Sequence, residues 1–220
     1  SVDQNGKLTY QVKAGKSGVA EVTVTVTDNG GTENGGEDSF SRSFSLTISS
    51  LPEVAIRTDK GISISKGETI QLTARGGSTY SWTNPEDVIS GSETETLIAR
   101  PAETTTYTVR VTGSSGCTAE KEITIFVKDD YAMLRPTNVI TPNGVGKNDR
   151  FVVTNIEMYT NHEVRIFDSA GRMLYNTKNY KNEWDGTFQG TTLDEGNYFY
   201  VVDFGKDKPT LKGYITIIRD

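Results

Sequence analysis

Residues 196–218 have the sequence GNYFYVVDFGKDKPTLKGYITII. Two stretches rich in aromatic and β-branched residues, 198–204 and 211–218, flank the loop formed by residues 205–209. Such stretches favour β-strands, and a short loop with Gly and Pro between them is typical of a hairpin. The sequence therefore predicts a β-hairpin at this end of the chain, and the region around it belongs to the all-β class.

The region preceding this hairpin continues the same pattern. Residues 131–220 hold most of the chain's tyrosines and phenylalanines, and cross-strand aromatic pairs stabilise small sheets. Ser169, Ala170 and Gly171 predict a hairpin turn, because Gly accepts positive φ. The other predicted strands of this region are residues 139–140, 151–153, 164–167 and 173–175.

Residues 51–130 predict an immunoglobulin-like sandwich without its disulfide. Apolar residues alternate at 70–74, 107–111 and 123–127, and turns such as Asn84-Pro85 separate about seven strands. Trp82 and Tyr107 occupy the positions of the core Trp and of the Tyr that precedes the second Cys. Leu72 and Val109 stand where the two cysteines would be. Through residues 80–82, 104–107 and 116–117 the segment resembles the Ig-like and PKD-like modules of secreted Bacteroidetes proteins.

Residues 1–50 predict too few strands for a closed sandwich. Apolar residues alternate with Thr and Glu over 20–27 and with Ser and Thr over 43–48, and Leu8 and Tyr10 suggest one shorter strand. Residues 6–10, 15–18 and 22–30 resemble the second half of a cadherin-like or Ig-like repeat of bacterial adhesins. The expected fold is thus all-β, with tandem antiparallel β-sandwiches of which the first is incomplete, and the expected domains are 1–50, 51–130 and 131–220.

Composition excludes several classes of function. The net charge is −6 and no segment is basic, which argues against binding to nucleic acid. The single cysteine, Cys117, permits no internal disulfide and is expected to be packed rather than reactive, and the single histidine, His162, is expected in a turn. No apolar run approaches the ~18 residues of a membrane span. The chain begins without Met or a signal peptide, so an export signal would lie outside it or have been removed.

Four separated blocks near this end carry the functional prediction. They are residues 138–151 (NVITPNGVGKNDRF), 184–186 (WDG), 193–200 (LDEGNYFY) and 212–219 (KGYITIIR), and they are called the signature segments below. Their order and spacing resemble the gliding-motility-associated carboxy-terminal domain, the type B sorting domain of the type IX secretion system. The residues that carry this resemblance, and the expected partner-recognition role, are Asn138, Pro142, Asn143, Gly144, Gly146, Asn148, Asp149, Phe151, Trp184, Asp185, Gly186, Gly196, Tyr198, Tyr200, Lys212, Gly213 and Arg219.

The resemblance implies an address rather than a reaction. Such domains direct a folded cargo to the outer-membrane translocon, and type B domains are thought to act with a PorP/SprF-like outer-membrane β-barrel. It implies an extracellular protein attached to the outer membrane, typically a large adhesin used in gliding. The upstream repeats would then contact a surface ligand. Within residues 131–220, the segment 138–151 and the terminal hairpin are the expected recognition surface.

The loop at residues 142–149 departs from the family pattern. The family carries Asp where this chain has Val145, and the family sequence resembles a calcium loop with oxygen ligands at alternate positions. Asn143, Asn148 and Asp149 remain as calcium candidates, and Asp28 and Asp38 are candidates in an earlier loop. The alternative, which the lost carboxylate favours, is that Asn143 and Asp149 cap turns and that Gly144 and Gly146 supply positive φ. No cofactor is expected.

Three rival functions stay open at this level. An enzyme is disfavoured because no nucleophile–base or metal-ligand set has a suitable spacing, although the tail of a polysaccharide-degrading enzyme is conceivable. Glycan-binding modules would need exposed stacking rings, and Trp82 is expected in the core. A purely structural or adhesive stalk explains residues 1–130 but not the aromatic composition and the signature segments of residues 131–220.

Overall fold

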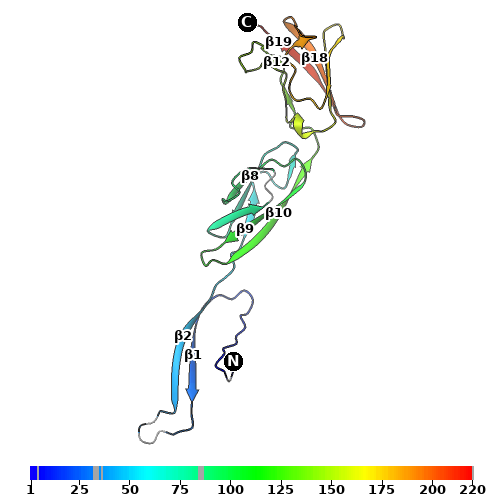
Figure 1. Cartoon of the computed structure of the whole chain (residues 1–220). Coiled ribbons are helices and arrows are strands. Elements are labelled where there is room, and N and C mark those ends of the chain that lie inside the picture. The colour runs from blue at the N-terminus through cyan, green and yellow to red at the C-terminus, as the bar shows by residue number, and fades with distance from the viewer. Residues whose placement is uncertain (4, 32–34, 36, 84–86, 220) are drawn as a thin grey trace.

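The structure is a computed structural model that describes residues 1–3, 5–31, 35, 37–83 and 87–219. It confirms the all-β class: strands in antiparallel sheets make up nearly all of the regular structure. Figure 1 shows a two-stranded hairpin, a sandwich and a second sandwich following one another from the N-terminus to the C-terminus. The described part of the chain contains no helix with the length and apolarity needed to cross a lipid bilayer.

The first region consists of one hairpin. Strands β1 (Gly18–Thr27) and β2 (Ser39–Ile48) pair in antiparallel register, with Val22 opposite Phe44 and Val26 opposite Phe40. The apolar residues lie on one face and remain largely exposed; Phe40 is 60% exposed. The strand expected around Leu8 and Tyr10 is replaced by an isolated bridge between Val2 and Leu8. The expected loop at residues 28–38 lies partly outside the described residues.

Residues 51–130, the Ig-like module, form two four-stranded sheets. One sheet has the order β3-β5-β8-β7 and the other β4-β10-β9-β6, with β4 parallel to β10. The described residues of this module thus form eight strands, where about seven were expected. Their bounds are β3 (Ala55–Thr58), β4 (Ser63–Ser65), β5 (Ile70–Arg75), β6 (Thr79–Thr83), β7 (Val88–Ser90), β8 (Thr96–Ala99), β9 (Thr105–Thr112) and β10 (Thr118–Lys128).

The core of the Ig-like module contains the residues that the sequence places there. Leu72, Tyr107 and Val109 are fully buried, Trp82 is nearly so, and Trp82 faces Val109 across β6 and β9. The indole Nε1 of Trp82 donates to the Thr94 carbonyl at 3.0 Å. The Tyr107 hydroxyl is buried without a partner among the described residues, so the hydrogen bond of a tyrosine corner is missing. The predicted Asn84-Pro85 turn lies outside the described residues.

Residues 131–220, the terminal module, are built on a five-stranded sheet of order β12-β19-β18-β14-β15. The terminal hairpin lies at its centre: β18 (Gly196–Asp203) pairs with β19 (Thr210–Ile217) (Figure 1). Phe151 is buried but precedes β13 rather than lying within it. The remaining elements are β11 (Arg135–Pro136), β12 (Val139–Ile140), β13 (Val153–Thr154), the 3-10 turn η2 (Ile156–Met158), β14 (Glu163–Phe167), β15 (Met173–Lys178), β16 (Thr187–Phe188) and β17 (Thr191–Thr192).

The Ig-like and terminal modules touch at a joint next to η2. Arg100 Nη1 donates to Asn155 Oδ1 at 3.2 Å, and Lys66 Nζ lies 5.2 Å from the centroid of the Tyr159 ring. A Cβ on Gly67 would lie 3.0 Å from the Asn155 side chain. Side chains of the Ig-like module therefore complete the environment of residues at the base of the terminal module.

Candidate recognition site

The loop after β12 is closed by a single carboxylate. Asp149 Oδ1 accepts the N–H groups of Asn143 and Gly144, both at 3.0 Å, and its Oδ2 accepts the N–H of Gly146 at 2.6 Å. Gly144 and Gly146 have φ of 80° and 84°, which glycine adopts without strain. Asn143 Oδ1 accepts the Val145 N–H at 3.2 Å. The loop thus has the turn-capping arrangement.

These contacts set the charge state of Asp149. Desolvation raises the pKa of its carboxyl, but the N–H groups of Gly146, Asn143 and Gly144, together with Arg150, outweigh it and leave the pKa below its ordinary value. Asn148, the third calcium candidate of this loop, has φ of 56°, and its carbonyl accepts the Thr141 N–H at 2.7 Å. The loop therefore presents a carboxylate whose two oxygens are already engaged.

The second signature segment packs under this loop. Trp184 is 2% exposed, and its indole Nε1 donates to the Thr187 carbonyl at 3.1 Å. Asp185 Oδ1 accepts the Thr187 hydroxyl at 2.7 Å. Gly186 has φ of 76°, and a Cβ there would lie 3.5 Å from Pro142 Cγ. The Trp is therefore a core residue, Asp-Gly forms a turn, and this turn contacts the first segment.

Tyr180, which the sequence analysis did not single out, ties the first two segments together. The Phe151 N–H donates to the Trp184 carbonyl at 2.8 Å, and the Tyr180 hydroxyl donates to the Phe151 carbonyl at 2.5 Å. The same hydroxyl accepts the Trp184 N–H at 3.2 Å. Burial raises the pKa of Tyr180 well above its ordinary value, so the hydroxyl stays protonated and can donate. The signal available in the sequence was a Tyr four residues before Trp184.

The terminal hairpin turns two of the predicted recognition residues inward. Tyr198 and Tyr200 are 8% and 7% exposed and belong to the core, so they are not available to a partner in this fold. Gly213 faces Tyr200 across the strands. Lys212 is exposed, and Gly196, with φ of 147°, begins β18. Phe199 and Tyr214, which are not among the predicted recognition residues, take outward positions of the hairpin beside Lys212, which is one of them.

Arg219 joins the end of the chain to the other segments. Its backbone N–H donates to Glu195 Oε1 at 2.5 Å, its Nε to the Leu193 carbonyl at 3.0 Å and its Nη1 to the Pro142 carbonyl at 3.3 Å. Its Nη2 is buried without a partner among the described residues. Asn138, exposed at the other side of β12, accepts the Thr216 N–H at 2.8 Å through its carbonyl. The Arg219 guanidinium thus holds the loop at Pro142 and the loop at Leu193 in place.

The segments meet around one surface depression. It has a volume of about 390 Å³, and residues of the first, second and fourth segments line it. The structure thus brings together side chains that are up to 77 positions apart in sequence, as the Arg219–Pro142 contact shows. Their role in recognition stays a prediction. The lining residues are Pro142, Gly144, Gly146, Asp149, Arg150, Asp185, Thr187, Thr192 and Arg219.

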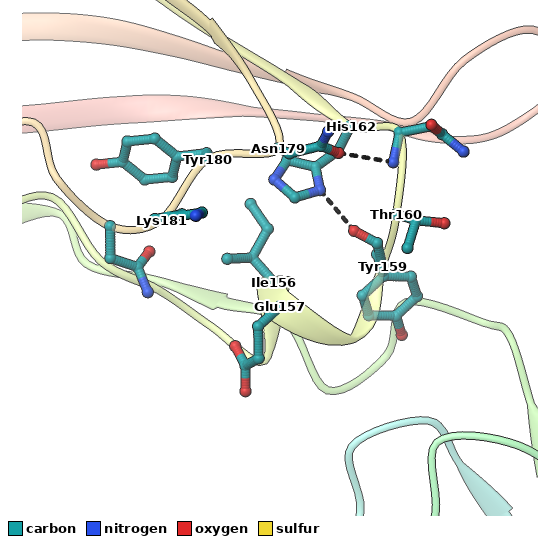
Figure 2. Close-up of a pocket in the computed structure, with 10 residues that line it drawn as sticks. Ile156, Glu157, Tyr159, Thr160, His162, Asn179, Tyr180 and Lys181 are labelled. Carbon is teal, nitrogen blue, oxygen red and sulfur yellow. Dashed lines mark hydrogen bonds between the residues drawn. The ribbon is translucent and has the colours of Figure 1, made fainter.

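A larger cavity of about 600 Å³ lies at the opposite end of the terminal module, next to η2 (Figure 2). His162 lines it and is 2% exposed; its Nδ1 donates to the Tyr159 carbonyl at 2.6 Å. Its Nε2 is buried and has no partner among the described residues. Asn161 and Asn179 also line the cavity, and the Asn161 N–H donates to Asn179 Oδ1 at 2.9 Å. None of the predicted recognition residues lines this cavity.

The calcium candidates do not gather into a cluster. Within the described ranges, no three His, Cys, Asp or Glu side chains come close enough to hold a metal ion. Asp28 Oδ1 accepts the Gly30 N–H at 2.7 Å, and the Asp28 N–H donates to the Asp38 carbonyl at 3.0 Å. Asp28 and Asp38 therefore close the neck of the β1–β2 loop, which is again a turn role.

Solved structures resemble the chain only distantly. A biofilm-associated protein BSP domain matches 76% of this chain and 30% of its own, with 16% identity and a TM-score of 0.30. A Bacteroides ovatus mixed-linkage glucan utilization locus protein, SGBP-B, matches 93% of this chain and 54% of its own, with 13% identity and a TM-score of 0.30. Latent PorU from Porphyromonas gingivalis matches 77% of this chain and 20% of its own, with 15% identity and a TM-score of 0.25.

The chain spans about half or less of the length of each of these three structures. No curated protein matches the chain. The family model of the CHU_C type IX secretion signal domain matches residues 134–217, which include β12, the loop closed by Asp149 and the terminal hairpin. Residues 134–217 of this chain are therefore a type IX secretion signal domain.

Proposed function

We propose that this chain is the carboxy-terminal region of a secreted cell-surface adhesin of the gliding-motility type. Its terminal module would direct export through the type IX secretion system and then dock to a PorP/SprF-like barrel in the outer membrane. The observation that supports this most directly is the convergence of the signature segments: Arg219, Pro142 and Gly186 meet at one end of a domain whose family is a secretion signal.

The polar groups of this region support recognition rather than catalysis. The two oxygens of Asp149 accept backbone N–H groups, and Asp185 accepts the Thr187 hydroxyl. A general base needs a lone pair within reach of a substrate proton, and three of the four oxygens of these carboxylates already accept hydrogen bonds from the protein itself. His162 Nδ1 likewise donates to a backbone carbonyl. We therefore propose that these residues form no active site.

Residues 1–130 would serve as spacers that hold the signal domain away from the rest of the protein. Glycan-binding modules are the main alternative, and they would need exposed aromatic rings for stacking. Trp82 and Trp184 are 5% and 2% exposed and fill the cores of their modules. In a purely structural stalk, residues 131–220 would be a further spacer without an export signal. The tail of a polysaccharide-degrading enzyme would instead carry the same terminal signal behind a different upstream domain.

The test is a secretion assay in a Bacteroidetes host. The 220-residue chain would be placed behind a signal peptide and a fluorescent reporter, and a matched fusion would end at residue 130. We expect the reporter to reach the cell surface or medium only with the full chain and only in cells with an intact secretion system. Deleting the PorP/SprF-like barrel should then shift the reporter from the surface to the medium. Periplasmic retention of the full fusion would refute the proposal.

A further inference from the structure

Four apolar side chains form a straight row across the outer face of the five-stranded sheet. Met173 on β15 pairs with Phe167 on β14, Phe167 pairs with Phe199 on β18, and Phe199 pairs with Tyr214 on β19. Met173, Phe199 and Tyr214 are 49%, 47% and 51% exposed. Side chains opposite one another in a sheet are neighbours, so these residues form one continuous apolar strip, called the outer row below.

The outer row ends at an open sheet edge. β12 covers only the end of β19, where Val139 pairs with Thr216 and Ile140 with Ile217. The N–H groups of Thr216 and Ile218 point toward β12, so the even-numbered residues of β19 direct their backbone groups to this side. Lys212 and Tyr214 are even-numbered, and no described residue accepts their N–H groups. An incoming strand would find free hydrogen-bonding groups there.

Two lysines and one acidic residue, Asp207, are exposed in the loop that precedes β19, so the charges beside this edge are mostly basic. Arg165, in the neighbouring row, is paired with Asp203 at 3.0 Å. Lys212 has no ion pair with a described residue, and Lys206 and Lys208 are exposed in the loop that precedes β19. The open edge of β19 is thus apolar at Tyr214 and basic at Lys212, two positions away on the same face.

We propose that the outer row and the open edge of β19 are the docking surface for an extended segment of the secretion machinery. This segment adds as a strand beside β19. It places an apolar side chain next to Tyr214 and an acidic side chain next to Lys212. The proposal rests on the proposed export function and names the surface that performs it. Phe199 and Tyr214 lie in the hairpin that the sequence suggests for recognition, but neither is among the residues that it singles out.

The physical basis is the combination of two features that folded proteins usually avoid. An unprotected edge offers main-chain hydrogen bonds, which give affinity to any extended chain. A contiguous apolar strip adds side-chain contacts in register with that chain, and aromatic residues at the centre of an interface carry most of its binding energy. Lys212 then restricts the choice of partner through charge.

The test uses the full 220-residue chain in the reporter fusion, with separate changes to the face and to the edge. Phe199→Thr combined with Tyr214→Thr removes the aromatic part of the row. Thr is β-branched and favours strands, so the two strands should still form. Lys212→Pro removes an N–H that points away from β18, so the hairpin keeps its own hydrogen bonds. We expect each change to lower the surface-exposed reporter about tenfold or more, the size expected for loss of an interface anchor.

Two control variants match these changes. Phe126→Thr removes an aromatic side chain that is 50% exposed on β10 of the Ig-like module. Asn176→Pro alters β15, the opposite edge, at a position whose N–H points outward, because the Asn179 N–H points to β14 and donates to His162. Both controls should be exported like the unaltered chain. Equal melting temperatures of the purified chains establish that all variants fold.

The outcomes separate the two proposals. If the unaltered chain is not exported, the export function fails and this inference fails with it. If the unaltered chain and all variants are exported equally, the function stands and the docking surface is wrong. A dimer in sedimentation that is lost in Lys212→Pro would assign the edge to a second copy and overturn the inference. Binding to outer-membrane lipid vesicles that depends on Phe199 and Tyr214 would overturn it in favour of a lipid surface.

Discussion

The ring of Tyr200 occupies the space over Gly213, its partner in the adjacent strand. A Cβ on Gly213 would lie 2.6 Å from Tyr200 Cζ, closer than real Cβ atoms come to other atoms. The glycine therefore makes room for a ring that fills the core, and it needs no positive φ to do so. Tyr200 is 7% exposed, so the ring has no solvent-facing alternative without opening the sheet.

Gly213→Ala should destabilise the terminal module by about 1–3 kcal/mol, the usual cost of forcing an extra carbon into a packed core. Urea unfolding of the chain in a Trp82→Phe background, followed by Trp184 fluorescence, measures this cost. Lys212→Ala, at the exposed neighbouring position, is the matched control and should change stability little. The stability cost of Gly213→Ala should be smaller when Tyr200 has also been changed by Tyr200→Leu, because the smaller side chain leaves room for the added carbon. Equal stability of Gly213→Ala and the unaltered chain would contradict the packing account.

Tyr180→Phe should lower the free energy of unfolding by about 1–3 kcal/mol, because the Phe151 carbonyl would be left buried without its donor. Trp184 would lose the acceptor of its N–H as well. Chemical unfolding measures the loss, and Tyr214→Phe, which removes an exposed hydroxyl, serves as the control. If both substitutions cost the same, the Tyr180 hydroxyl does not hold the two signature segments together.

Alternation in the sequence was enough to predict the core of the Ig-like module. Leu72, Val109 and Val111 are fully buried, and each lies in a strand that alternates with polar residues. The same rule fails at residues 198–200, where three aromatic residues follow one another. Such a run carries no period-2 signal, so the sequence could not tell which ring faces the core. The signature tyrosines were assigned to recognition, whereas the structure turns them inward and leaves Phe199 outside.

The candidate sites show a second limit of sequence reasoning. The turn roles of Asn143, Gly144, Gly146 and Asp149 follow from residue types within one loop, and local chemistry was sufficient to predict them. The outer row depends on strand pairing between segments far apart in the chain and on a register shift after Ile166. No single segment contains that information. The role of Tyr180 could not be predicted for the same reason, because its partners, Phe151 and Trp184, lie on two separate loops.

The Asp149 carboxyl should titrate below its ordinary pKa of 3.8. Because the folded-state pKa is lowered, its contribution to stability is present above pH 3.8 and is lost as the pH falls through the folded value. The carbon-13 shift of the carboxyl, followed by NMR during acid titration, gives the midpoint. The Gly146 amide shift should follow the same curve and stop responding in Asp149→Asn. A midpoint at or above 3.8 would show that the three N–H groups do not hold the carboxylate.

Val145→Asp should turn this loop into a calcium site. Val145 is 73% exposed above the loop, and an acidic side chain there restores the family's carboxylate close to Asp149. Millimolar calcium should then raise the melting temperature of the variant by a few degrees, as expected for a ligand that binds only the folded state. The unaltered chain and Val145→Asn should show no such shift. A calcium effect on all three would place the ion elsewhere in the chain.

Arg100→Ala should destabilise the terminal module although Arg100 belongs to the Ig-like module. Asn155 is 7% exposed, and the substitution removes the donor to its Oδ1, which is buried at the joint. A loss of about 1 kcal/mol is expected for one such hydrogen bond. In a Trp82→Phe background, Trp184 is the remaining tryptophan, so its fluorescence during urea unfolding reports the terminal module specifically. Arg110→Ala is the control, because Arg110 forms an exposed ion pair within the same module, with Glu120 at 3.9 Å. If the Trp184 transition is the same in both variants, the two modules unfold independently and the joint is a contact without energetic coupling.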